Sequence, residues 1–295
     1  MGIPKGGIAF FDSGIGGLTV LNECKKVLPN EVFYYYGDNK HAPYGNLSVK
    51  KIKKYVSRAF KRLQRLRVKA VVLACNTVTA VCVEELRAKY SFPIIGAEPA
   101  VLRAAKEGGE VFVLSTRATY ESGRFQALLE KSALLFPRTK IKVFPCDHLA
   151  GEIEKYILTK GKDYTSFLPN GAPNSVVLGC THYVYLAEQI GRFYSCPVFD
   201  GNQGIAMRLC NVLTENNAPK TRLDPFRPPE QKKCVFSLSK RRRKEEKGND
   251  NGKRGSSVKK RRWLLIPLKE GGHGQIYFLG SGKKRCKSIN KQTFA

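Results

Sequence analysis

Two stretches of the chain share one pattern: VVLACNTVTAV at residues 71–81 and VVLGCTHYVYL at residues 176–186. In each stretch, an apolar run of strand character ends on a small residue and a cysteine, Cys75 or Cys180, and small polar residues follow. Open α/β sheets place their ligand crevices at the carboxyl ends of the strands. The repetition therefore predicts two similar halves that face each other across a cleft, each contributing one thiol.

Around these motifs, short apolar runs alternate with segments of helical periodicity. This alternation is typical of parallel sheets covered by helices on both faces, and a length of 295 residues fits two domains. We therefore predict an α/β fold with two domains, each a mainly parallel sheet flanked by helices, and an active site in the cleft between them. Strands are predicted at 8–11, 32–36, 70–74, 93–96, 111–114, 141–144, 175–178, 197–199 and 276–282, and helices at 18–28, 52–66, 77–90, 117–131, 149–159, 184–194 and 203–214.

The chain is strongly basic, and its charge is unevenly placed. The formal net charge is +28, and residues 219–295 hold 23 Lys and Arg against 6 Asp and Glu. The run at 240–262 has too few apolar residues to fold alone, so we expect a disordered basic insertion there. Clustered Lys and Arg bind phosphates without sequence preference, so nucleic acid is one candidate partner of this run, and a merely solvated insertion is the alternative.

Composition also bounds the compartment and the chemistry. The sequence has no apolar run of about eighteen residues and no signal layout at its start, which predicts a cytoplasmic protein without a membrane partner. Its nine cysteines are scattered singly, without C-x-x-C pairs, so we expect free thiols.

Cys75 and Cys180 suit the removal and delivery of protons. An unperturbed thiol has a pKa of about 8.5, so a modest downward shift makes one cysteine a thiolate while the other stays protonated near neutral pH. One sulfur could then take a proton from a carbon and the other deliver a proton to its opposite face, which inverts a stereocentre. Two buried structural thiols, a disulfide, or one nucleophile beside an incidental cysteine would give the same spacing.

Other polar residues occupy predicted strand ends. His182 follows Cys180 by two residues, where an imidazole can relay a proton or be purely structural. The C-x-H spacing lacks further ligands, so no metal site is predicted. Asp12 ends the first strand, and the glycines after it favour an anion or simply make a tight turn. DSGIGG misses the G-x-G-x-x-G spacing and its acidic residue precedes the glycines, so the pattern does not favour a dinucleotide cofactor.

The loop HAPYG at residues 41–45 follows another predicted strand. It therefore lies at the same edge of the predicted sheet as the other polar motifs. The backbone N–H groups of Tyr44 and Gly45 could face a ligand carboxylate there, and a bare turn is the alternative reading.

Five motifs follow one another along the chain: DSGIGGLTVL (12–21), GDNKHAPYG (37–45), ACNTVTA (74–80), GAEPA (96–100) and GCTHY (179–183). In this order and at these intervals, they resemble the glutamate racemase family over roughly residues 8–215. The resemblance implies a cofactor-independent enzyme that supplies D-glutamate for peptidoglycan. It also implies two pseudo-symmetric domains, one of residues 1–97 plus 207–295 and one of residues 98–206, with the active site between them.

The resemblance also implies roles for individual residues. Cys75 and Cys180 correspond to two catalytic cysteines, which take the α-proton of D- and L-glutamate respectively. Asp12 looks like the acid beside the first cysteine, and His182 looks like the histidine beside the second. The positions that match substrate-binding residues are Asp12, Ser13, Pro43, Tyr44, Gly45, Asn76, Thr77, Thr181 and His182.

One assignment is open, and parts of the chain depart from the family pattern. Glu154 resembles a further catalytic carboxylate near the second cysteine, with Glu152 as its rival. Val184 stands where the family usually has proline, and residues 200–206 differ enough that we assign no substrate contacts there. The run at 240–262 has no counterpart in the resemblance.

The predicted reaction is therefore the cofactor-independent racemisation of L-glutamate to D-glutamate by proton transfer at two cysteines. The nearest rival is a racemase of aspartate or another acidic amino acid, because a sequence does not measure the depth of a carboxylate site. Glutamate is the predicted small-molecule partner, and a homodimer is left open.

Overall fold

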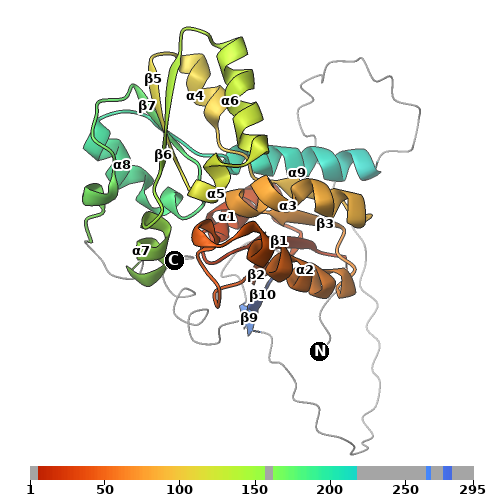
Figure 1. The fold of residues 1–295 in the computed structure, drawn as a ribbon. Helices are drawn as coiled ribbons and strands as arrows, with labels where there is room; N and C mark the ends of the chain where they lie inside the picture. Colours follow the sequence, from red (N-terminus) through yellow and green to blue (C-terminus); the bar gives the residue numbers. More distant parts are fainter. Residues whose placement is uncertain (1–5, 157–161, 218–263, 267–274, 281–295) are drawn as a thin grey trace, which may run out of the picture.

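The computed structural model describes residues 6–156, 162–217, 264–266 and 275–280. Within these ranges the chain forms two separate sheets with helices packed on them, as Figure 1 shows, so the predicted α/β fold class is confirmed. The basic run at 240–262, with its predicted disorder and nucleic-acid binding, lies outside the described residues. No helix in the described part of the chain has the length and apolarity needed to cross a bilayer.

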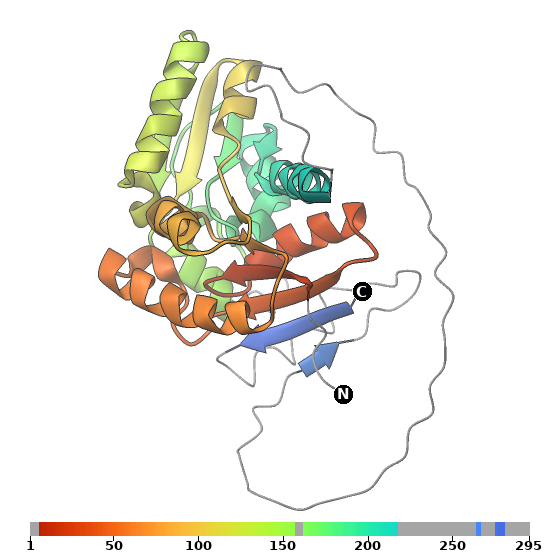
Figure 2. The ribbon, with the colours of Figure 1, turned by 90° about the vertical axis from the view of Figure 1, so that its right-hand side faces the viewer.

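The first sheet has the strand order β4-β3-β1-β2-β10-β9. Neighbouring strands are parallel except for β9, which runs antiparallel to β10 at the edge. The predicted returning strand is β10, which lies beside β2 although more than 200 residues separate them. In Figure 2, β10 is the longer blue strand. The strands are β1 (Ile8–Asp12), β2 (Val32–Gly37), β3 (Ala70–Leu73), β4 (Ile94–Gly96), β9 (Leu264–Ile266) and β10 (Gln275–Gly280).

The second sheet is wholly parallel and has the order β6-β5-β7-β8. Its strands are β5 (Glu110–Ser115), β6 (Lys140–Pro145), β7 (Ser175–Leu178) and β8 (Val198–Phe199). The helices of the described residues are α1 (Gly17–Val27), α2 (Val49–Arg65), α3 (Asn76–Lys89), α4 (Val101–Glu107), α5 (Arg117–Tyr120), α6 (Gly123–Leu135), α7 (Leu149–Tyr156), α8 (Ala187–Tyr194) and α9 (Asn202–Asn217), with short 3₁₀ turns η1 (Tyr44–Asn46), η2 (Thr165–Phe167) and η3 (Tyr183–Leu186).

Burial on both faces explains why the strands read as continuous apolar runs. Along β1, Ala9 and Phe11 pack in a cluster with residues of α2 and α3, whereas Ile8 and Phe10 pack on the opposite face with residues of α1 and α9. Parallel strands covered in this way have no solvent face to mark with polar residues. Leu209 of α9 belongs to that second cluster, so the chain returns to the first sheet after completing the second.

Two helical segments differ from the sequence expectation. The single helix predicted at 117–131 is divided into α5 and α6, because Thr116 caps the first and Ser122 caps the second by accepting a hydrogen bond from a backbone N–H. Helix α4 was not predicted at all. It has only seven residues and ends at Gly108, whose φ of 83° suits glycine.

Candidate active site

Cys75 lies at the carboxyl end of β3, immediately before the first turn of α3. Its side chain is buried, and its Sγ lies 3.7 Å from Ser13 Oγ, to which the thiol donates. Burial, followed by the negative charge of Asp12, raises the pKa of Cys75 to about 12. This cysteine is therefore a thiol near neutral pH and can donate a proton.

Asp12 is the last residue of β1 and is completely buried. One carboxylate oxygen accepts a hydrogen bond from Gly14 N at 2.8 Å, and the other accepts from Thr181 Oγ1 at 3.3 Å. Burial raises the pKa of Asp12, and the charge of His182 and the Gly14 N–H oppose this shift. We call the part of the molecule built on the first sheet the first half and the part built on the second sheet the second half. Because Thr181 follows β7 of the second sheet, the Asp12 carboxylate connects the two halves.

Cys180 follows β7 and has a different set of neighbours. Its Sγ lies 3.6 Å from Nδ1 of His182, and Nε2 of His182 lies 2.7 Å from Oε1 of Glu154. Burial alone would lower the pKa of His182, but the hydrogen bonds and charges of Cys180 and Glu154 outweigh burial and raise it well above its ordinary value. The imidazole of His182 therefore connects the sulfur of Cys180 to the carboxylate of Glu154.

The two candidate carboxylates on α7 have separate environments. Glu154 is buried against His182. Glu152 instead forms ion pairs with Lys162 at 2.8 Å and Lys155 at 3.4 Å. The hydrogen bond from Lys162, with a further one from Lys155, lowers the pKa of Glu152. Of the two, only Glu154 can act on His182.

Groups from both halves fix the glycine-rich turn after β1. Ile15 donates its N–H to Oε1 of Glu154 at 2.9 Å, and its carbonyl oxygen accepts from the Tyr185 hydroxyl at 3.0 Å. The Gly14 carbonyl accepts from the Tyr35 hydroxyl at 2.8 Å. A Cβ on Gly14 would overlap Glu154 Oε1, so the absence of a side chain lets the carboxylate approach.

The first turn of α3 presents polar groups next to Cys75. Asn76 begins the helix, and its buried Oδ1 has no hydrogen-bond partner among the described residues. Thr77 Oγ1 lies 3.0 Å from Oγ1 of Thr116, which follows β5 in the second half. Free N–H groups at a helix N-terminus, joined by such side chains, form a site that suits a carboxylate.

The HAPYG loop lies at the same edge of the first sheet. The Tyr44 hydroxyl donates to Oδ2 of Asp38 at 2.6 Å, which leaves the backbone of the loop rather than this hydroxyl for a ligand. Pro43 follows a cis peptide bond. A Cβ on Gly45 would lie 2.9 Å from Cγ2 of Thr116, so the loop touches the second half directly.

The two sulfurs lie close enough to influence each other. The charge of Cys180 contributes to the raised pKa of Cys75, although the two residues are 105 positions apart in the sequence. A small cavity of about 10 Å³ is lined by Asn76 from the first half and by Cys180 and Thr181 from the second. The structure thus brings the two repeated motifs together.

Several contributors to the site were not predicted from the sequence. Thr116 and Thr119 lie within 2.9 Å of each other and both contact Thr77, and Tyr185 and Asp38 hold the two loops described above. Thr116 follows β5 directly, so the rule that selected the other strand ends could also have selected it.

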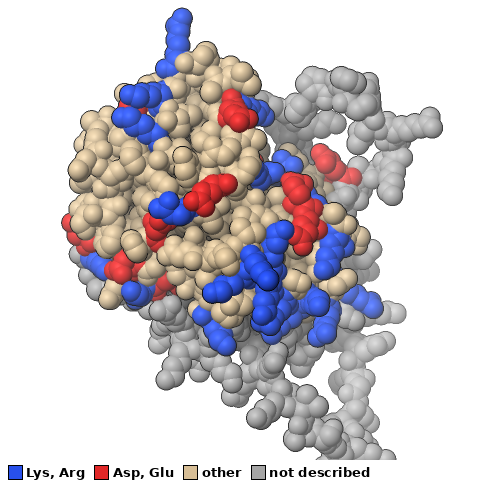
Figure 3. All heavy atoms as spheres, viewed as in Figure 1, with Lys and Arg blue, Asp and Glu red and all other residues tan. Residues whose placement is uncertain are grey.

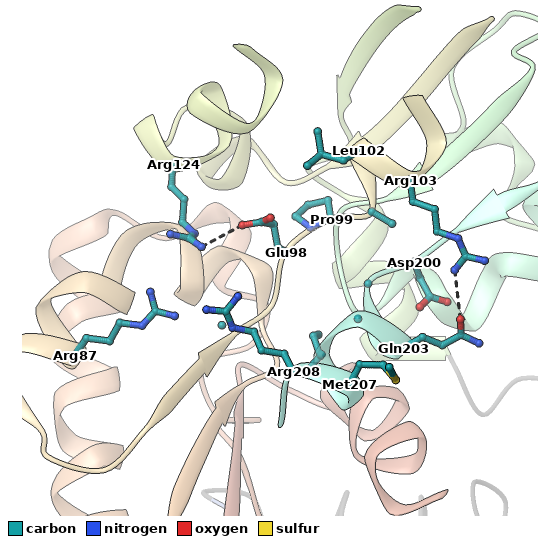
Figure 4. A pocket seen from close by; sticks show the side chains of 15 residues that line it. Arg87, Glu98, Pro99, Leu102, Arg103, Arg124, Asp200, Gln203, Met207 and Arg208 are labelled. Carbon is teal, nitrogen blue, oxygen red and sulfur yellow. Dashed lines mark hydrogen bonds and ion pairs between the residues drawn. The ribbon is translucent and has the colours of Figure 1, made fainter. Parts of the chain in front are cut away.

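A larger cavity, of about 470 Å³, lies where the chain crosses between the halves (Figure 4). No cysteine lines it, and four arginines do: Arg87, Arg103, Arg124 and Arg208. Arg124 pairs with Glu98 at 3.0 Å, and Arg103 donates to Gln203 Oε1 at 3.3 Å. Part of the 200–206 segment lines this cavity.

Comparison of the sequence with known proteins identifies the family of this chain. The profile of the Asp/Glu/Hydantoin racemase family matches residues 20–209, and the chain belongs to that family. Among curated proteins it is similar to the glutamate racemase of Clostridium novyi, with 39% identity over 230 residues that cover 74% of this chain and 87% of that protein. The resemblance drawn from the five motifs is therefore confirmed.

Solved structures agree with this placement. The glutamate racemase of Escherichia coli, determined with L-glutamate and the activator UDP-MurNAc-ala, has a TM-score of 0.65 and 30% identity, covering 74% of this chain and 85% of that one. The glutamate racemase of Francisella tularensis, determined with D-glutamate, has a TM-score of 0.60 and 28% identity, covering 75% of this chain and 86% of that one.

Proposed function

We propose that the protein is a glutamate racemase that moves one proton on and one proton off the α-carbon of glutamate, using Cys75 and Cys180 and no cofactor. The observation that carries the proposal is the pair of buried sulfurs with opposite surroundings. Cys75 lies beside the carboxylate of Asp12, and Cys180 lies beside the imidazole of His182. The similarity to glutamate racemases, over about three quarters of the chain, supports glutamate as the substrate.

In the direction from L-glutamate, Cys180 as a thiolate takes the α-proton and becomes a thiol. The Cys75 thiol delivers its own proton to the opposite face of the same carbon and becomes a thiolate. The substrate gains and loses one proton, so its configuration inverts without net oxidation. The reverse direction uses the same two steps, with the thiolate on Cys75 at the start.

The intermediate between the two steps carries negative charge next to the α-carboxylate. The N-terminus of α3, Asn76 and Thr77 provide donors next to Cys75, while the Thr181 hydroxyl donates to Asp12. Preorganised donors stabilise developing charge most strongly where water is excluded. Holding both carboxylates also fixes the α-carbon between the sulfurs, and positioning of this kind can lower a barrier by about 7–11 kcal/mol.

Ser13 and the HAPYG loop are the proposed binding site of the side-chain carboxylate. The loop is held by Asp38 on one side and touches Thr116 on the other, so its distance from the cysteines is fixed by packing. A fixed distance discriminates between diacids of different length, and the similarity to glutamate racemases supports glutamate over the shorter aspartate. By analogy with the family, we further propose that the D-glutamate produced supplies peptidoglycan synthesis in the cytoplasm.

The test is turnover of L-glutamate in deuterated water by the purified, cofactor-free protein, with D- and L-aspartate as the competing substrates. We expect one deuterium at the α-carbon of the D-glutamate product and at least a hundredfold preference for glutamate. Cys75→Ala and Cys180→Ala should each abolish racemisation. Cys82→Ala, which changes a buried cysteine of α3 outside the site, should retain it. Full racemisation by Cys75→Ala would disprove the two-sulfur mechanism.

A further inference from the structure

Helix α2 is the most basic described segment of the chain. Its 17 residues include eight Lys and Arg and no Asp or Glu. The surrounding sequence extends this imbalance, because residues 39–83 contain eleven Lys and Arg and no acidic residue. The proposed racemase chemistry uses none of these charges.

The basic residues of α2 lie on one face. At 100° per residue, the positions 50, 54, 58, 61 and 65 fall within an arc of about 80°, and they extend over about 22 Å of helix. Their side chains are exposed: Lys50, Lys54, Arg58, Lys61 and Arg65. The opposite face is packed into the core of the first sheet through Ile52, Val56, Ala59, Phe60 and Leu63. We call these five basic residues the α2 row.

Carboxylates of the described residues do not neutralise the row. Lys53, which lies outside it, pairs with Glu85 at 2.8 Å, and Arg62 beside it donates to the Tyr36 hydroxyl. None of the five row members forms an ion pair within the described part of the chain. Like charges four residues apart destabilise a helix, so a row of this kind gains from a bound polyanion. Figure 3 shows the Lys and Arg side chains gathered where Figure 1 places α2.

We infer that the α2 row binds the sugar-phosphate backbone of a nucleic-acid duplex without reading its sequence. A duplex carries one negative charge per 1.7 Å of its axis, so a straight row of about 22 Å faces about six base pairs. A basic stripe along one helix in a chain with a pI of about 9.9 is the expected electrostatic footprint of such binding. This inference concerns a surface separate from the cysteines and does not depend on the proposed racemisation.

An anionic membrane fits the row less well. Helices that bind bilayers insert an apolar face, and the apolar face of α2 is already buried against the sheet. All five positions of the row are Lys or Arg, so the row itself offers no aromatic or aliphatic side chain that could insert into a bilayer. Steering of the small anionic substrate is the remaining alternative, and it would act on the rate of catalysis rather than on duplex binding.

The experiment measures the binding of the full chain to a fluorescein-labelled 20-bp DNA duplex of arbitrary sequence by anisotropy, from 50 to 300 mM salt. A matching RNA duplex and vesicles containing phosphatidylserine are the other ligands. The test variant is Lys54→Glu/Arg58→Glu/Lys61→Glu. The control variant Lys106→Glu/Lys131→Glu/Arg138→Glu reverses three exposed charges on or next to the helices of the second sheet and changes the net charge equally.

At 100 mM salt, we expect the test variant to bind the DNA duplex at least tenfold more weakly than the wild type and the control variant to stay within threefold. The slope of log K against log salt should become less steep by about 2.7 in the test variant, which corresponds to three lost phosphate contacts. A melting temperature equal to that of the wild type would show that the variant is folded.

Four outcomes would overturn the inference. In the first, the wild-type protein binds neither duplex; in the second, the test variant binds DNA as tightly as the wild type does. In the third, both variants lose DNA affinity equally, which would make net charge the cause. In the fourth, the test variant loses only vesicle binding or only kcat/KM, which would assign the row to a membrane or to substrate steering.

Discussion

Replacing Glu154 with glutamine tests the proposed role of His182 beside Cys180 more sharply than removing a cysteine does. The amide keeps an oxygen that can accept the hydrogen bond from Ile15 N, now 2.9 Å long, so the glycine-rich turn stays in place. What the substitution removes is the negative charge 2.7 Å from His182 Nε2. Its effect should therefore appear on the imidazole and not on the fold.

The expected size follows from this contact. A hydrogen bond to a charged group contributes about 1.5–3 kcal/mol, and each 1.36 kcal/mol of barrier is a factor of ten in rate. We expect Glu154→Gln to lower kcat by about tenfold to a hundredfold with L-glutamate, with a smaller change in KM, because Glu154 acts through His182. The pKa of His182 should fall, since the charge of Glu154 is one of the causes that raise it.

The raised pKa of His182 also determines how the free energy of unfolding should change with pH. A histidine whose pKa is raised by folding contributes stability that is present below its unfolded pKa and is lost as pH rises through the folded pKa. The free energy of unfolding of Glu154→Gln should therefore differ most from the wild type below about pH 6.5. The difference should narrow as the solution becomes alkaline.

The assay combines steady-state kinetics in both directions with an NMR titration of the imidazoles, which four histidines make tractable. The matched control is Glu152→Gln, two residues earlier on the same helix, whose partners are Lys162 and Lys155. That variant should retain wild-type kcat. Equal losses in the two variants, or an unchanged titration of His182 in Glu154→Gln, would refute the assigned contact.

Three further predictions address the first half of the site. Tyr185→Phe removes the hydrogen bond to Ile15 O and should lower kcat/KM about fivefold, with the exposed Tyr120→Phe unchanged. Gly14→Ala forces a Cβ onto Glu154 and should reduce both activity and melting temperature, whereas Gly123→Ala meets no atom within 4 Å and should do neither. The pKa of Cys75 is raised from 9.0 to about 12, so its alkylation by iodoacetamide should rise about tenfold per pH unit from pH 8 to 11. The contribution of this thiol to stability should be present below pH 9 and lost as the pH rises toward 12. A plateau of the alkylation rate near pH 9 would contradict the raised pKa.

The strands were readable from the sequence because each is buried on both faces. A strand such as β1 has no polar alternation, and a continuous apolar run between turns is the direct signature of that environment. Helix α4 left no comparable signature, because a seven-residue helix spans barely two turns and offers too few positions to show a period.

From residue pattern alone, site residues could be predicted only where a reactive side chain lies at the end of a strand. Cys75, Cys180 and Asp12 meet that condition, and the structure brings them together. Glu152 and Glu154 could not be separated from the sequence, because residues two apart on a helix point about 200° away from each other and only packing decides which one faces inward. Tyr185 was missed for a related reason, since its partner lies in the other half of the fold.

The two halves repeat one motif, yet they do not repeat one environment. The negative charge of Asp12 is one cause, after burial, of the raised pKa of Cys75, whereas the neighbour of Cys180 is the imidazole of His182. The proposed exchange needs one thiol and one thiolate at the same time, because two thiols provide no base and two thiolates provide no acid. The asymmetry between Cys75 and Cys180 is therefore what a one-proton exchange requires of a symmetric fold. In the proposed mechanism, each turnover of L-glutamate leaves a thiol at Cys180 and a thiolate at Cys75, so the starting protonation state must be restored before the next L-glutamate can react.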